Sequence, residues 1–89
     1  SQQYWKKKKQ ENELRRLFDS LTKREKEVIL LAVKGYSNKE IASSLYIGPE
    51  TVKMHCANAY AKLEVGSRLE AYSLLQKIPG IDVNVEKKK

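Results

Sequence analysis

The chain has 89 residues, 40% of them hydrophobic, which suffices for one compact domain with a single core. Its longest apolar run, residues 28–33, is far shorter than the roughly 20 residues that cross a bilayer, and no apolar stretch or small-residue cleavage site near residue 1 suggests secretion. A lone cysteine, Cys56, excludes an internal disulfide and a cysteine pair for zinc, so we expect a reducing, cytoplasmic setting. The net charge of +7 comes largely from lysine runs at 6–9 and 87–89, so charge alone does not assign nucleic-acid binding.

The first twenty residues read as a linker and a leading helix. Residues 1–9 are polar and lysine-rich, and we expect them to be disordered. A leading helix near 10–19 is then predicted by apolar residues at helical spacing: Leu14, Leu17, Phe18 and Leu21.

Four further helices have clear start signals. Three are capping boxes, in which a hydroxyl stands three residues before a glutamate: Thr22 with Glu25, Ser37 with Glu40, and Ser67 with Glu70. The fourth start places Pro49 at the first helical position, with Glu50 in the first turn. Stops at Gly35, Gly48, Gly66 and Pro79-Gly80 complete helices near 23–34, 38–45, 49–63 and 68–78.

The predicted fold class is therefore all-α, a four-helix tetrahelical helix-turn-helix bundle over 21–78 with an additional leading helix. Residues 79–89 hold two isolated valines and three final lysines, too little for a paired strand. We expect this segment to be a flexible C-terminal tail.

Only Tyr46, Ile47 and Gly48 separate helices 38–45 and 49–63. Two helices joined by such a short glycine-containing turn are typical of the helix-turn-helix, whose second helix enters the DNA major groove. One face of helix 49–63 is the expected core stripe, made of Val52, Cys56, Ala59 and Leu63. The opposite face holds short or potentially base-reading side chains: Glu50, Lys53, Met54, Ala57, Asn58 and Ala61.

This opposite face favours close approach to DNA. The alanines let the helix backbone come near a flat partner, Lys53 and Asn58 can donate to base edges, and Met54 can contact a thymine methyl. Residues on the flank are spaced to reach phosphates: Thr51, His55 and Lys62.

Simpler interpretations stand beside these. Both lysines could be ordinary solvated side chains and both alanines mere helix formers. We expect Tyr36 and Tyr46 to pack at helix corners rather than stack on bases. His55 has no second histidine or nearby cysteine partner for a metal, and Cys56 is expected to be a small buried hydrophobe.

The pattern closely resembles the LuxR-type (GerE-type) helix-turn-helix signature of bacterial transcription regulators over about 21–78. The residues that carry the resemblance are Leu21-Thr22, Arg24-Glu25, Glu27-Val28, Gly35, residues 37–42 (SNKEIA), Leu45, Ile47, Thr51-Val52-Lys53, His55, Lys62-Leu63, Val65, Arg68 and Ala71. The resemblance implies base reading by Lys53, Met54 and Ala57. It implies DNA-backbone contacts by Ser37, Asn38, Lys39, Thr51, His55 and Lys62.

Two positions depart from the family pattern. Gly48 stands where the family usually has a serine or similar cap, so one phosphate-contacting hydroxyl is missing. Ala59 stands where a larger aliphatic residue is common. With so few polar reading positions, we expect sequence preference to depend also on DNA shape.

Helix 68–78 supplies a second surface. Its expected core stripe is Ala71, Leu74, Leu75 and Ile78, which leaves Leu69, Tyr72, Ser73 and Gln76 outward. The family resemblance implies that this helix pairs protomers, so we predict a homodimer seam there, against the alternative of scattered surface hydrophobes.

The predicted function is double-stranded DNA binding as a regulator's output domain, with no enzyme activity, metal or cofactor. The alternatives are a sigma-factor-like promoter-recognition region and a helical protein-interaction module. The continuation past helix 49–63 into a further packed helix favours the LuxR type. We expect an upstream sensing domain, with RNA polymerase as a candidate partner.

Tyr4-Trp5 followed by four lysines suggests a further hypothesis. Such a sequence is typical of a membrane exit on the cytoplasmic side, so the chain could be the cytoplasmic part of a membrane-anchored regulator. The alternative is a linker after a soluble receiver domain.

Overall fold

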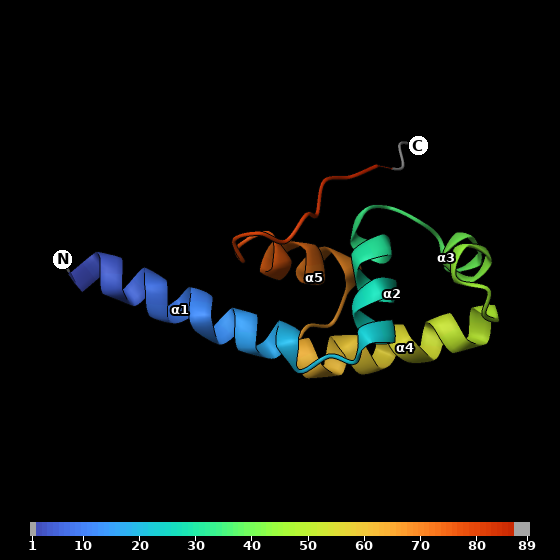
Figure 1. The fold of residues 1–89 in the computed structure, drawn as a ribbon, viewed down its shortest axis with the longest axis horizontal. Helices are drawn as coiled ribbons and strands as arrows, with labels where there is room; N and C mark the ends of the chain where they lie inside the picture. Colours follow the sequence, from blue (N-terminus) through green and yellow to red (C-terminus); the bar gives the residue numbers. More distant parts are fainter. Residues whose placement is uncertain (1, 87–89) are drawn as a thin grey trace.

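The structure, a computed structural model, describes residues 2–86. Within them lie five α-helices and no strand: α1 (Gln2–Asp19), α2 (Lys23–Val33), α3 (Asn38–Leu45), α4 (Pro49–Leu63) and α5 (Arg68–Leu75). The all-α prediction is confirmed. Figure 1 shows α2 packed above α4 and running across it, whereas α1 and α4 lie end to end along the longest dimension of the molecule, 48 Å.

The capping boxes form at two of the three predicted starts. Thr22 Oγ1 accepts the Glu25 N–H at 3.1 Å, and the Glu25 carboxylate accepts the Thr22 N–H at 2.9 Å. Ser37 and Glu40 make the same reciprocal pair before α3, at 3.1 and 2.9 Å. Before α5, Ser67 accepts the Glu70 N–H, but the Glu70 carboxylate accepts the N–H of Gly66 at 2.7 Å instead.

The turn between α3 and α4 contains two helix-capping residues, Tyr46 at the end of α3 and Gly48 at the start of α4. Tyr46 ends α3 in the left-handed conformation (φ 58°) with its side chain 95% exposed, so the prediction that it packs at a corner is wrong. The outward turn of this capping residue leaves Ile47 to pack against the core. Gly48 begins α4 without a side-chain cap, and a Cβ there would meet open space.

Two adjoining apolar clusters form the core, and α4 contributes to both. One joins the end of α1 to α2, α4 and α5 through Phe18, Ile29, Leu63 and Leu75, among others. The other joins α2, α3 and α4 through Val28, Ile41, Val52 and Cys56, among others. Since the buried residues of α4 lie in both clusters, the direction of its outer face is fixed by the whole bundle.

The leading helix is longer than predicted, because it begins at Gln2 rather than near residue 10. Residues 2–19 contain no glycine, proline or β-branched residue, and glutamine and lysine are good helix formers, so the helix continues where the apolar pattern has ended. The predicted disorder of residues 2–9 is therefore wrong, and Ser1 lies outside the described residues. None of the helices in residues 2–86 combines the length and apolar content that membrane crossing requires.

The C-terminal segment also differs from its prediction. Helix α5 ends at Leu75, and residues 81–86, here called the strap, return to the end of α2. Val83 is buried, the Glu86 N–H donates to the Lys34 carbonyl at 3.0 Å, and Lys34 Nζ lies 3.7 Å from Asp82. The prediction of a free tail is thus wrong for the strap, because an apolar side chain and paired charges fasten it. Residues 87–89 lie outside the described residues.

The strap makes a prediction about stability. Val83→Ala removes two buried methyl groups from the first cluster and should lower the free energy of unfolding by about 1–3 kcal/mol. Val85→Ala is the matched control, because Val85 lies in the same strap but is 56% exposed. Urea denaturation compares the two variants, and equal losses would show that the strap is not packed on the bundle.

Candidate nucleic-acid interface

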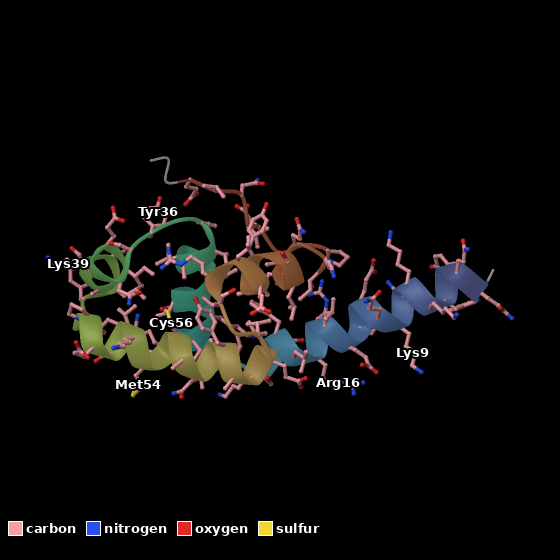
Figure 2. All side chains as sticks on the ribbon, turned by 180° about the vertical axis from the view of Figure 1, so that it is seen from behind. Lys9, Arg16, Tyr36, Lys39, Met54 and Cys56 are labelled. Carbon is pink, nitrogen blue, oxygen red and sulfur yellow. The ribbon has the colours of Figure 1, made fainter. Side chains whose placement is uncertain are left out.

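Helix α4 has the two faces that its sequence predicts. Val52, Cys56, Ala59 and Leu63 are all buried, as expected for the core stripe. The opposite residues are all exposed: Glu50, Lys53, Met54, Ala57, Asn58 and Ala61. Figure 2 shows the Met54 side chain pointing away from the bundle at its lower edge. The exposed face along the helix is therefore mostly uncharged, since only Glu50 and Lys53 among these six residues carry a charge.

The predicted flank of this face is more enclosed. Thr51 and His55 are half-buried. Nδ1 of His55 is buried and has no hydrogen-bond partner among the described residues.

The amino-terminal end of α3 brings together the other predicted backbone contacts, Ser37, Asn38 and Lys39. Ser37 uses its oxygen as an acceptor for the Glu40 N–H, so its hydroxyl proton remains for an external acceptor. Lys39 is exposed and Asn38 half-buried. Figure 2 shows Lys39 at the end of the molecule where α3 meets α4.

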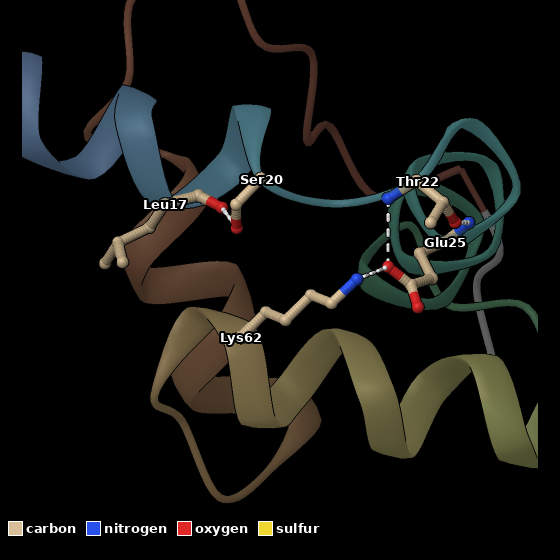
Figure 3. A network of polar contacts seen from close by, with 5 residues as sticks. All are labelled: Leu17, Ser20, Thr22, Glu25 and Lys62. Carbon is tan, nitrogen blue, oxygen red and sulfur yellow. Dashed lines mark hydrogen bonds and ion pairs between the residues drawn. The ribbon is translucent and has the colours of Figure 1, made fainter.

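Lys62, a predicted phosphate-contacting residue, makes an ion pair that the sequence did not predict. Its Nζ lies 2.8 Å from Oε1 of Glu25, and the same carboxylate oxygen accepts the Thr22 N–H (Figure 3). The Glu25 side chain is only 5% exposed, whereas that of Lys62 is 39% exposed. Hydrogen bonds from Lys62 and then from the Thr22 backbone lower the pKa of Glu25, although burial opposes them. The pair joins the start of α2 to the last turn of α4.

Cys56 lies on the inner side of α4. Burial raises the pKa of its thiol, and the nearby Arg68 opposes this only in part. A protonated, buried thiol is a packing group rather than a nucleophile, as the sequence predicted.

Part of the predicted seam on α5 is exposed. Leu69 is 73% exposed and Gln76 is exposed, whereas Tyr72 and Ser73 are half-buried. Tyr72 packs against the first core cluster, so it is not a free outward residue as expected. Ile78 is buried just beyond the end of the helix.

Within residues 2–86, no three His, Cys, Asp or Glu side chains are grouped closely enough to hold a metal ion. A short α3, a three-residue turn and a longer α4 with an open outer face define a helix-turn-helix domain of the DNA-binding class.

Comparison with known proteins identifies the family. Residues 19–75 match the family described as bacterial regulatory proteins, luxR family. The chain belongs to this family, a family of DNA-binding domains that are not enzymes, and the predicted resemblance is confirmed.

Its similar relatives include the response regulator protein VraR of Staphylococcus aureus (strain Mu3) and that of Staphylococcus saprophyticus. Each is 53% identical over 55 residues, which are 62% of this chain and 26% of the relative. The chain thus spans about a quarter of the length of the curated relatives it matches. No solved structure is a significant match.

The Glu25–Lys62 pair predicts a stability effect with a defined pH dependence. Lys62→Met leaves a buried carboxylate without its cation and should lower the free energy of unfolding by about 1–3 kcal/mol, toward the lower end because Lys62 is partly exposed. Since the folded-state pKa of Glu25 lies below the unfolded value near 4.5, the pair contributes fully above that value. Its contribution is lost as the pH falls through the folded-state pKa.

Chemical denaturation of the single and double variants with Glu25→Gln from pH 7 to about pH 3 measures this coupling. The coupling energy should shrink as the solution becomes acidic. A coupling that is absent at pH 7, or that grows on acidification, would contradict the role given to this pair.

Proposed function

We propose that this chain is the DNA-binding output domain of a bacterial transcription regulator of the response-regulator type. The observation that carries the proposal is the outer face of α4, whose six residues are all exposed, include two alanines and lie opposite a completely buried stripe. Such a face fits a helix that approaches the edges of base pairs. The names of the VraR relatives support the response-regulator type.

Four residues of α4 read the bases: Lys53, Met54, Ala57 and Asn58. The lysine and the asparagine donate to acceptors in the major groove, and Met54, 51% exposed, meets thymine methyl groups. Ala57 permits close approach. Only two polar readers are present, so DNA shape contributes to the preference.

Phosphate contacts fall to two groups of residues. At the start of α3 they are Ser37, Asn38 and Lys39, whose free hydroxyl proton, amide and ammonium suit an anion. Beside α4 they are Thr51, His55 and Lys62. Lys62 has three ammonium donors and gives one to Glu25, so its partly exposed head can also bind a phosphate.

The remaining partners extend this proposal. A second copy pairs through α5 around Leu69, Tyr72, Ser73 and Gln76, and the dimer holds two half-sites. The proposed full regulator also contains an upstream sensing domain, RNA polymerase is a candidate partner, and the setting is the bacterial cytoplasm. The membrane-exit hypothesis for Tyr4-Trp5 stays a prediction, which the residues encoded before Ser1 will test.

Base reading is tested by Lys53→Ala. Sites are first selected from random duplexes with the unsubstituted chain, and affinities are then measured on the selected site and on mixed-sequence DNA. The substitution should cost about 1–3 kcal/mol on the selected site and relax preference at one position, with little loss on mixed DNA. Equal losses on both duplexes would remove Lys53 from base reading.

Pairing through α5 is tested by Leu69→Glu, the cleanest variant because Leu69 is 73% exposed and Tyr72 is not. The charge should abolish cooperative binding to two half-sites about one helical turn apart and leave single half-site binding intact. Gln76→Glu adds the same charge at another exposed position of the proposed seam and should weaken cooperativity less. Full cooperativity in both variants would remove α5 from the interface.

A further inference from the structure

Positive charge is distributed unevenly between α1 and the rest of the described chain. Helix α1 carries six lysines and arginines against three acids, whereas residues 20–86 carry nine against eight. Four of those nine are ion-paired with carboxylates: Arg24, Lys26, Lys34 and Lys62. The electrostatic attraction that DNA binding requires is thus concentrated outside the helix-turn-helix itself.

One stripe of α1 combines this charge with full exposure. Trp5, Lys9, Asn12 and Arg16 follow one another at spacings of four, three and four residues, so they share a face of the helix. All four are exposed, and Lys9 and Arg16 make no ion pair among the described residues. Two carboxylates flank the stripe, Glu13 and Asp19, and Asp19 already pairs with Lys26 at 3.8 Å.

The orientation of this stripe is set by the packing of α1. Phe18 is buried in the first core cluster, Leu14 and Leu17 pack against it, and Arg15 donates to the Pro79 carbonyl. The opposite side of the helix, with Lys7, lines a groove together with Gln76 and Lys77, which follow the end of α5. The stripe therefore points away from α5.

Figure 2 shows Lys9 and Arg16 of α1 pointing to the same side of the molecule as Met54 of α4. The two helices lie end to end (Figure 1), so the outer face of α4 continues into the stripe of α1. When a duplex receives α4 in its major groove, the stripe of α1 is therefore on the side of the molecule that faces the DNA.

We propose that the Trp5–Lys9–Asn12–Arg16 stripe is a second DNA-contacting surface, which binds phosphates of the duplex flanking the half-site. Lys9 and Arg16 neutralise phosphate charges, while the Asn12 amide and the Trp5 indole N–H are neutral donors. These contacts hold the backbone without reading sequence. The inference rests on the proposed function, since α4 must occupy the groove for α1 to reach the flank.

The test is the salt dependence of binding, measured by fluorescence anisotropy on labelled mixed-sequence duplexes of about 30 base pairs, roughly three helical turns. Each phosphate neutralised adds about 0.9 to the slope of log K against log salt, so Lys9→Gln/Arg16→Gln should lower that slope by about two. The difference should shrink on a duplex of about 12 base pairs, which leaves little flank beyond α4.

The matched control is Lys7→Gln/Lys77→Gln, which removes the same charge from the groove between α1 and the residues that follow α5. Its slope should equal that of the unsubstituted chain. Glutamine is a good helix former, so helix content measured by circular dichroism should be equal in both double variants.

Each outcome is decisive. An unchanged slope for the stripe variant, or an equal fall in the control, overturns the α1 surface. Loss of binding to phosphatidylserine-containing vesicles with an unchanged DNA slope would instead make the stripe a lipid-headgroup surface and also overturn it. If the unsubstituted chain binds no duplex, the proposed function itself fails. If it binds and Lys53→Ala reduces its affinity for the selected site, only the α1 contact is in question.

Discussion

The structure depends on the burial of one narrow stripe of α4. Val52, Cys56, Ala59 and Leu63 lie within two clusters that draw on every other helix, so removing them from water drives the assembly and sets the roll of α4 about its axis. Because side chains on a helix have fixed angular positions, fixing the inner face also fixes the outer one. The proposed interface is thus a consequence of the core rather than a separate construction.

The Glu25–Lys62 pair adds a directional contact to this non-directional packing. A buried carboxylate is costly unless it is hydrogen-bonded, and Glu25 is satisfied by the Thr22 N–H and the Lys62 ammonium together. The same glutamate therefore caps α2 and holds the last turn of α4. In this pair the capping of one helix is coupled to the placement of another, which ordinary surface ion pairs do not achieve.

Most of the fold could be predicted from the sequence because its signals are local. Capping boxes, the Pro49 start and the stripe of α4 depend on neighbours within one or two turns, and they place α2, α3 and α4 within a residue of their observed bounds. The predictions that were wrong depend on contacts that local patterns do not contain. Val83 is buried because residues 81–86 return to the end of α2, far from them in the sequence. Helix α1 extends to Gln2 because its residues have high helix propensity, although the added turns have no apolar face.

The candidate site was predictable as a set of exposed positions, but its electrostatics was not. Spacing assigns Lys53 to base reading and Lys62 to phosphate contact, but it does not show whether either lysine is ion-paired. The structure leaves Lys53 exposed without an ion pair among residues 2–86 and pairs Lys62 with a buried glutamate. A phosphate that binds Lys62 must share it with Glu25, so its attraction is weaker than that of an unpaired lysine. Ion pairs within the bundle therefore weaken the attraction of their own cations for a polyanion, and they leave Lys39, Lys53 and the α1 residues Lys9 and Arg16 exposed for that attraction.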